Sequence, residues 1–240
     1  MKTVVVRILS FVLALPALAG CDPSLDLIDV RAGCPDMPLR GPGEFASAPA
    51  DTMIDDFEDA NLSLAQVGGR TGAWMGSLGP TPAPGSTVDL DPSSECVARG
   101  TRSAHLTSMA TATYAASWTA VMMAQTPAPQ SFDASSYRGF SFWIARGDRA
   151  VPPFETPIGV TTEDTAPAFG ICESCNDYYA IKTRIPLTTT WTRWFVPFSD
   201  LRQYGFGRPL VPLRRDKLVS IIIWPEPQFD IWIDDLRFEP

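Results

Sequence analysis

The feature that most constrains the fold is a series of short, strand-like runs separated by turn residues, which begins near residue 52 and continues to the end of the chain. No helical periodicity is sustained, and the one helical turn expected is at 199–203, where Ser199 is a candidate cap. Short runs at this spacing predict an all-β domain, an antiparallel β-sandwich, over residues 51–240. The expected strands are 53–57, 72–77, 103–109, 113–123, 139–145, 156–162, 178–185, 191–197, 218–224 and 229–238.

Alternation within the runs indicates which face of a strand enters the core. Phe140, Phe142 and Ile144 share one face, opposite Ser141 and Trp143. This period of two is typical of a strand packed on one side, and it supports a sandwich with turn-rich connections.

The N-terminus has the three parts of an export signal. Lys2 and Arg7 supply positive charge, an apolar stretch at 8–15 follows, and small residues precede Cys21. The apolar stretch is shorter than the roughly 20 residues of a spanning helix. The sequence Leu-Ala-Gly-Cys at 18–21 resembles the lipobox of bacterial lipoproteins, which implies a diacylglyceryl group on Cys21. The alternatives are an ordinary signal peptide with an incidental cysteine and a short membrane helix.

A lipid on this cysteine divides the chain into three parts. Residues 1–20 are the signal peptide, and 21–50 are a Pro/Gly/Ala-rich tether that Cys34 pins to the domain at 51–240. Buried acyl CH₂ groups hold such a protein to a membrane at about 0.8 kcal/mol each. We therefore expect the protein in the cell envelope, on a membrane facing the periplasm or the cell exterior.

The charge of the chain argues against nucleic acid as a partner. Loss of Lys2 and Arg7 with the signal leaves 17 of the 19 Lys and Arg residues against 27 Asp and Glu, a mature net charge of −10. Nucleic-acid binding depends on basic clusters that displace counterions from phosphates, and the sequence has no basic run.

The cysteines other than the lipid acceptor form an even set of four, as expected in an oxidising compartment. Of the three ways to pair them, we favour Cys172 with Cys175 and Cys34 with Cys96. A zinc site at 172–175 would need a second pair of ligands, which the sequence lacks. A redox role would need a strand-to-helix turn of a βαβ unit.

Catalytic motifs are not found in the sequence. His105 is the single histidine, it lies in an expected strand, and no Gly-x-Ser-x-Gly elbow accompanies it, so we interpret it as structural. Two carboxylates suffice for glycoside hydrolysis, but a chain with 27 acidic residues offers such pairs by number alone. We expect a protein that is not an enzyme.

Four segments taken in order carry a family resemblance. They read IDDFED at 54–59, DASSYRGFSFW at 133–143, WTRWFVPFSDL at 191–201 and FDIWIDDLRF at 229–238. Together they resemble the galactose-binding-like β-jelly-roll domains, especially carbohydrate-binding modules of family 11. The resemblance covers roughly residues 52–240 and implies a jelly-roll sandwich. It says less about function, which must be argued from the site.

In jelly rolls of this kind the first and last strands lie together and often share a structural Ca²⁺, which takes six to eight oxygen ligands. The resemblance therefore implies a calcium site where the acidic residues of both strands meet. In order of preference, the candidate ligands are Glu58, Asp235, Asp56 and Asp234. The alternative is strand-end charge that is solvated or paired with Arg70 or Arg237.

The last strand changes its apolar parity along its length. Ile231 and Ile233 are odd-numbered, whereas Leu236 and Phe238 are even-numbered. A bulge near 234–235 would explain the change and would redirect a carboxylate.

A jelly roll binds sugar on its concave face or on the loops at one end, with aromatic rings against the C–H faces of the sugar and polar groups on its hydroxyls. The candidate platforms are Tyr114, Trp118, Tyr178, Tyr179 and Trp224, with Asp177, Arg184 and Glu226 as polar partners. We interpret Trp143, Trp191 and Trp194 as packing residues.

The sequence thus predicts a monomeric, membrane-anchored module that binds a poly- or oligosaccharide. One alternative is an envelope or assembly protein that uses the fold to bind a protein partner, and another is a small polysaccharide hydrolase or lyase. An exposed aromatic strip would favour sugar, a flat apolar patch a protein partner, and a deep cleft with converging carboxylates an enzyme.

Overall fold

The structure of the protein is a computed structural model of the whole chain. The described residues are 34–37, 49–67, 70–78, 85–109, 117–121, 130–152, 154–170, 172, 175–205, 207, 212–224 and 229–240. The expected signal peptide and Cys21 lie outside them, as does most of the tether. Within these ranges, no helix has the length and apolar character needed to cross a membrane.

The structure is all-β and antiparallel, as the sequence predicts. One sheet, named here the β14 sheet, has the order β11-β6-β14-β4-β3, with β1 also paired to β14; the other, the β13 sheet, has the order β12-β9-β8-β13-β5-β2. A small pair joins β7 and β10. The strands are β1 Met53–Asp55, β2 Ala73–Ser77, β3 Val88–Ser93, β4 Ser103–Ser108, β5 Ser117–Val121, β6 Gly139–Arg146, β7 Glu155–Thr156, β8 Ile158–Thr162, β9 Tyr179–Ile181, β10 Ile185–Pro186, β11 Thr192–Pro197, β12 Leu201–Gln203, β13 Leu218–Ile223 and β14 Asp230–Glu239.

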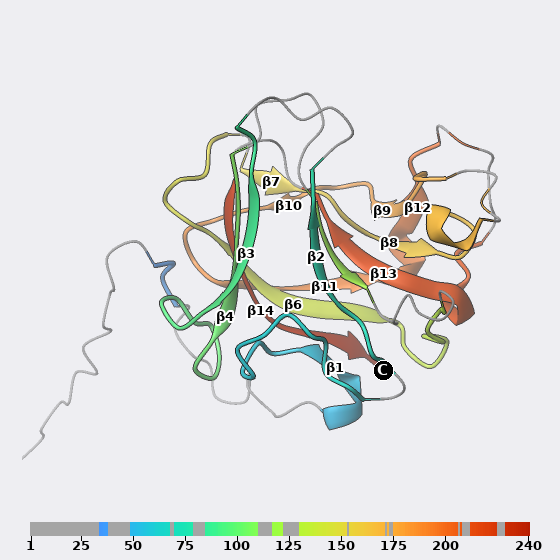
Figure 1. Cartoon of the computed structure of the whole chain (residues 1–240), viewed down its shortest axis with the longest axis horizontal. Helices are drawn as coiled ribbons and strands as arrows, with labels where there is room; N and C mark the ends of the chain where they lie inside the picture. Colours follow the sequence, from blue (N-terminus) through green and yellow to red (C-terminus); the bar gives the residue numbers. More distant parts are fainter. Residues whose placement is uncertain are drawn as a thin grey trace, which may run out of the picture.

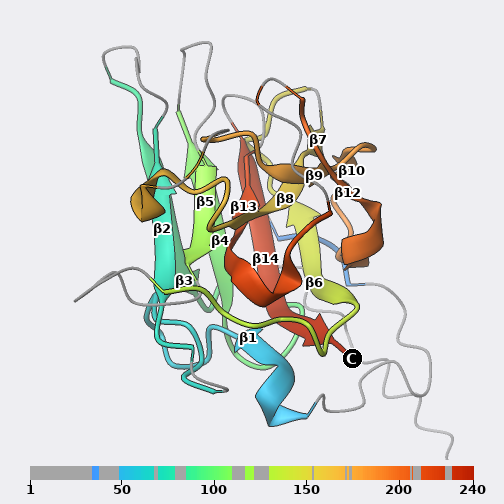
Figure 2. The same cartoon turned by 90° about the vertical axis from the view of Figure 1, so that its right-hand side faces the viewer.

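The two sheets face each other across a single apolar core, which makes a β-sandwich (Figures 1 and 2). Strand β6 shows how the sequence builds both of its faces. Phe140, Phe142 and Ile144 are buried in the core between the sheets, as their alternation predicts. Trp143 points the other way, into a second cluster on the outer face of the β14 sheet.

The outer cluster is covered by a piece of the N-terminal segment. Cys34 and Met37 pack against it, and a disulfide joins Cys34 to Cys96 of the cluster. Asp36 donates its N–H to Thr189 at 2.7 Å and accepts the N–H of Trp191 at 2.9 Å. This middle part of the expected tether is therefore fixed to the sandwich, as the sequence predicts for Cys34.

Each of the ten expected runs contains a strand, but the sequence misses β3 and β12. Strand β3 is acidic and contains Pro92, which a sheet accepts at its edge, where β3 lies. The helical turn expected at 199–203 is only partly correct, because Phe198–Asp200 form a 3₁₀ turn whereas Leu201–Gln203 form β12. Ser199 is not a cap, since the turn has no side-chain cap hydrogen bond. The four 3₁₀ turns of the described chain are η1 Ala50–Thr52, η2 Pro167–Phe169, η3 Phe198–Asp200 and η4 Arg215–Lys217.

The expected bulge is present in β14. Its register with β6 shifts between Asp234 and Arg237, and Asp235 has a φ of 52° in the left-handed region. The extra residue changes which side chains enter the core, so Ile231 and Ile233 before it and Leu236 and Phe238 after it are all buried there.

Candidate functional site

Three partly exposed aromatic side chains meet at the β12–β9–β8–β13 end of the β13 sheet. Tyr178 precedes β9, Tyr204 follows β12 and Trp224 follows β13, and we call them the aromatic trio. The ring of Tyr178 lies edge-on to Trp224, with centroids 6.1 Å apart. The ring of Tyr204 lies tilted on Trp224 at 5.8 Å and is 53% exposed. Burial raises the pKa of the Tyr178 hydroxyl above its ordinary value.

A glycine lets the central ring of the trio lie close to the sheet. A Cβ on Gly159 in β8 would come within 2.9 Å of Cη2 of Trp224 and 2.2 Å of the carbonyl oxygen of Tyr179. The indole therefore packs on bare backbone of β8. Such a ring lies close to the sheet and remains partly exposed, which suits a stacking platform.

Asp177 holds the loop that carries Tyr204. It is fully buried, and it accepts hydrogen bonds from the N–H of Gly205 at 2.9 Å and of Gly207 at 3.1 Å. The side chain of Gln203 also donates to it at 3.3 Å. The structure thus places Asp177, a predicted ligand residue, as a buried support for the loop that carries Tyr204.

Two other predicted ligand residues do not join the trio. Tyr179 follows Tyr178 on a strand, so its side chain enters the opposite face, where it is only 4% exposed. It is therefore not part of this platform. Arg184 pairs with Glu155 at 3.4 Å, beside the small β7–β10 pair.

The structure does not describe the side chains of the remaining predicted ligand residues. Tyr114 and Glu226 lie outside the described residues. Trp118 belongs to β5, where it is opposite Ile223 of β13 and Gly76 of β2. Tyr204 was missed, although an aromatic residue immediately before Gly205 is a signal for a ring on a turn.

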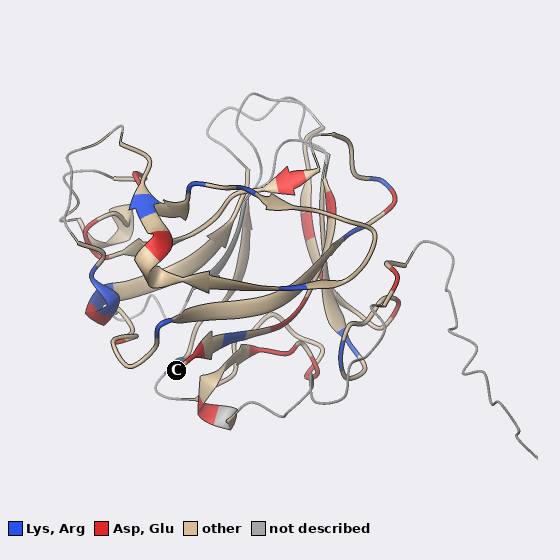
Figure 3. Cartoon of the chain, turned by 180° about the vertical axis from the view of Figure 1, so that it is seen from behind, with Lys and Arg blue, Asp and Glu red and all other residues tan. Residues whose placement is uncertain are grey.

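The four predicted calcium ligands do share a pocket, of about 180 Å³, at the junction of β1 and β14. Figure 3 shows acidic residues gathered where these two strands lie together near the C-terminus. Both oxygens of Glu58 accept hydrogen bonds from Thr101, at 2.7 Å from its N–H and 2.6 Å from its hydroxyl. Burial opposes ionisation of Glu58, but these hydrogen bonds lower its pKa below the usual range.

Arginines lie among these carboxylates. Asp235 Oδ2 is 3.2 Å from a nitrogen of Arg99 and 3.2 Å from one of Arg237. Pairing with Arg237 is the alternative expected from the sequence, whereas Arg70 instead donates to backbone carbonyls of Asp51 and Met53. In the described chain, no group of three or more Asp, Glu, His or Cys side chains is arranged as a metal site.

Asp234 is the carboxylate of this junction with an unused oxygen. Its Oδ2 accepts the N–H groups of Ala98 and Arg99 at 3.0 and 2.7 Å, whereas its buried Oδ1 has no hydrogen-bond partner. Burial raises the pKa of Asp234 to about 8, and burial likewise raises the pKa of Asp55 to about 7. An unpaired, buried oxygen on a residue that lines a pocket with other acids is the kind of group that a hard cation satisfies.

The four described cysteines and the histidine have structural contacts. The two disulfides are Cys34–Cys96 and Cys172–Cys175, the pairing favoured from the sequence. His105 stacks on Trp232 with centroids 3.8 Å apart, and its Nε2 is 2.6 Å from Asp230. Trp143 and Trp191 are buried in the outer cluster, and Trp194 packs against the main core, as interpreted from the sequence.

No family model matches the sequence, and no curated protein matches it. Solved structures do match the fold. A family 11 carbohydrate-binding module of the cellulosomal cellulase Lic26A-Cel5E of Clostridium thermocellum is 18% identical, with a TM-score of 0.53 over 80% of this chain and 96% of that one. A family 11 module from the same organism, in complex with a β-1,3-1,4-mixed-linked tetrasaccharide, is 16% identical, with a TM-score of 0.51 over 78% of this chain and 94% of that one.

The likeness covers nearly the whole of each module and most of the described sandwich. At these identities it bears on the fold and leaves the ligand to the site itself. This chain has the β-sandwich fold of the family 11 carbohydrate-binding modules.

Proposed function

We propose that this protein is a non-catalytic, carbohydrate-binding module of a membrane-anchored lipoprotein. The observation that carries the proposal is the aromatic trio, in which Tyr178 and Tyr204 flank Trp224 at one end of the β13 sheet. Flat, partly exposed rings accept the apolar C–H faces of sugar rings, and the phenol hydroxyls offer hydrogen bonds to sugar hydroxyls. The fold of the matched modules supports the same class of ligand.

The test is a glycan-array screen of the purified full-length protein, followed by titration calorimetry with a glycan that binds. Trp224→Ala and Tyr204→Ala should each weaken binding at least tenfold, about 1.4 kcal/mol. Phe154→Ala is the matched control, because Phe154 is a partly exposed aromatic residue in another part of the sandwich. Full binding by both trio variants would contradict the role of the trio. If the folded protein binds no glycan at all, a protein partner becomes the better explanation.

The anchor is proposed from the sequence alone. Cys21 at the end of the export signal would carry the lipid and hold the module on a membrane facing the periplasm or the cell exterior. In a bacterial host, Cys21→Ser should move the protein from the membrane fraction to the soluble fraction, whereas Cys172→Ser should not. Retention of Cys21→Ser in the membrane would count against lipidation.

We also propose that the acidic pocket binds a structural Ca²⁺. The unpaired Oδ1 of Asp234 supports this, together with Asp56, Glu58 and Asp235 around the same pocket. The ion would compete with Arg99 for Asp235, so bound calcium would release a guanidinium group that now pairs there. Its part would be to join the first and last strands, with the sugar bound elsewhere.

A further inference from the structure

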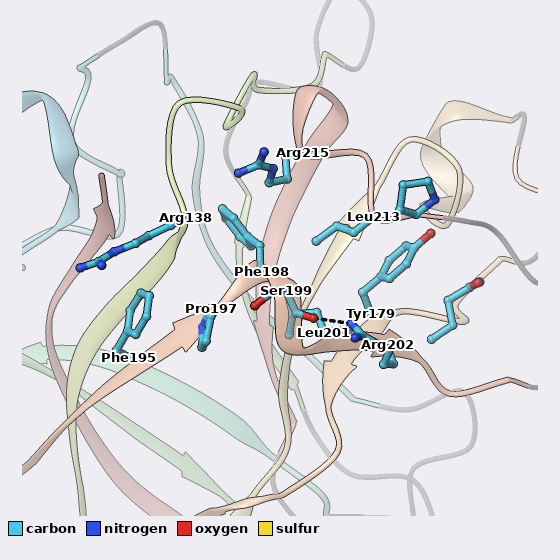
Figure 4. Close-up of a pocket in the computed structure, with 12 residues that line it drawn as sticks. Arg138, Tyr179, Phe195, Pro197, Phe198, Ser199, Leu201, Arg202, Leu213 and Arg215 are labelled. Atoms are coloured by element: carbon cyan, nitrogen blue, oxygen red, sulfur yellow. Dashed lines mark hydrogen bonds between the residues drawn. The ribbon is translucent and has the colours of Figure 1, made fainter.

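A second pocket lies at the open edge of the sandwich, where the chain crosses from one sheet to the other. It has a volume of about 810 Å³ and is lined by residues of β11, η3, β12 and η4, with Arg138 at the start of β6 and Tyr179 of β9. Figure 4 shows Phe195 beside Arg138 on one side of the pocket and Tyr179 beside Arg202 on the other. This volume is typical of a pocket for a small molecule or a short oligomer.

Three exposed arginines line this pocket: Arg138, Arg202 and Arg215. Arg202 donates to the backbone oxygens of Ser199 and Leu201, and Arg215 donates to that of Tyr137 at 2.7 Å. Across the described part of the chain, none of the three has a carboxylate within ion-pair distance. Each retains N–H donors with no acidic partner there.

The rest of the lining is aromatic and apolar. The guanidinium group of Arg138 lies 5.1 Å from the ring centroid of Phe195, a cation–π contact that holds the charge over the ring. Phe195 remains 41% exposed, and Pro197 and Leu213 continue the apolar wall. The pocket therefore combines a flat apolar surface with guanidinium groups on more than one side.

The positive charge of these arginines favours an anionic ligand. The whole chain carries a formal net charge of −8, yet three arginines without acidic partners in the described chain converge on one pocket. Arginine presents a planar fork that binds carboxylate or sulfate oxygens in pairs. An anion held here would be the partner that these groups lack.

The pocket is distinct from the aromatic trio, although both lie beside strands β9 and β12. None of the three trio residues lines the pocket, whereas Tyr179 and Gln203, the chain neighbours of Tyr178 and Tyr204, do. The two surfaces therefore consist of different residues, one of aromatic rings and one of arginines around Phe195.

We propose that this pocket is a second saccharide site, specific for a sugar that bears a carboxylate or sulfate group. The guanidinium groups bind the anionic substituent, and Phe195 receives the C–H face of the ring. An anionic saccharide would contact both the aromatic wall and the arginines, whereas an acidic peptide such as polyglutamate would contact only the arginines.

Titration calorimetry on the purified full-length protein tests the site with three tetrasaccharides: tetragalacturonate, a sulfated carrageenan tetramer and neutral cellotetraose. We expect saturable binding of one or both anionic probes, and the probe that binds identifies the anionic group. Arg138→Gln and the double variant Arg138→Gln/Arg215→Gln should weaken that binding at least tenfold. Arg214→Gln is the matched control, because Arg214 lies next to Arg215 and pairs with Asp216 instead.

Arg138 is the best single position because its guanidinium group has no hydrogen-bond partner among the described residues, so its loss leaves the backbone contacts intact. Trp224→Ala should leave anionic binding unchanged, which separates this site from the trio if either fails alone. The proposal is overturned if neither anionic probe binds, if Arg214→Gln loses as much as Arg138→Gln, or if polyglutamate binds as well as the saccharides.

Discussion

Asp177 Oδ1 accepts the N–H of Gly205 at 2.9 Å, which ties the residue before Tyr178 to the residue after Tyr204. One buried carboxylate therefore holds together two of the three rings of the aromatic trio. The rings proposed to contact glycan are partly exposed, whereas the carboxylate that supports them is buried.

We expect Asp177→Ala to weaken glycan binding and to lower the free energy of unfolding by about 1–3 kcal/mol, because the N–H groups of Gly205 and Gly207 lose their acceptor. Asp177→Asn should do less, since its amide oxygen still accepts one of these hydrogen bonds. Calorimetry with a bound glycan and urea unfolding measure both effects. Asp91→Asn, at an exposed position on β3, is the control and should change neither. Unchanged glycan affinity in Asp177→Ala would show that the Tyr204 loop keeps its position without this carboxylate.

The Cys34–Cys96 disulfide should stabilise the fold far more than Cys172–Cys175. It joins residues 62 apart in sequence, so the chain-entropy effect is about 4 kcal/mol, whereas the other bond joins residues only 3 apart. We expect Cys34→Ser/Cys96→Ser to lower the thermal midpoint strongly and to expose the tryptophans of the outer cluster to water, seen as a red shift of fluorescence. Cys172→Ser/Cys175→Ser is the control. Equal losses in the two double variants would contradict the assigned role of the 34–37 segment.

Calcium should raise the thermal midpoint of the wild-type protein relative to chelator. At about 100 times its dissociation constant, a ligand that binds only the folded state contributes about 2.7 kcal/mol. Asp234→Asn should remove most of this response, because its Oδ1 is the unpaired oxygen of the acidic pocket. Asp89→Asn, exposed on β3, should keep the response in full. An identical midpoint with calcium and with chelator would mean that Arg99 and Arg237 neutralise the cluster without a metal ion.

Asp230 should make stability depend on pH in the acid range. Burial opposes its ionisation, but the hydrogen bond from His105 and the contacts with Arg149 lower its pKa below the ordinary value of 3.8. A carboxyl whose pKa is lower in the folded state adds stability above the unfolded pKa and loses it as pH falls through the folded one. We expect Asp230→Asn to be less stable than wild type at pH 7, with the difference shrinking below about pH 4, as followed by urea unfolding. A difference that stays constant with pH would show that the charge of Asp230 contributes nothing.

The class of fold and several local features follow from short-range patterns in the sequence. Alternation of Phe140, Phe142 and Ile144 against Trp143 was sufficient to define a strand with a core face, because the period of two is a property of the backbone. The parity change in the last strand likewise located the bulge at 234–235, since one added residue reverses which side chains face the core.

Which residues form the candidate sites depends on tertiary contacts between segments that are far apart in the sequence. Tyr178 and Tyr179 are adjacent tyrosines that the sequence does not distinguish. Tyr178 contacts Trp224 whereas Tyr179 is buried, because neighbouring side chains of an extended backbone point to opposite faces. Asp177 supports the loop of Tyr204 because the fold places the N–H groups of Gly205 and Gly207 against its carboxylate. Arg138, Arg202 and Arg215 are scattered over the sequence. They meet at one pocket because Phe198 of η3 donates its N–H to Arg138 and Arg215 donates to Tyr137. Local periodicity is encoded in short stretches of sequence, whereas contacts between distant segments depend on how the two sheets pair and pack.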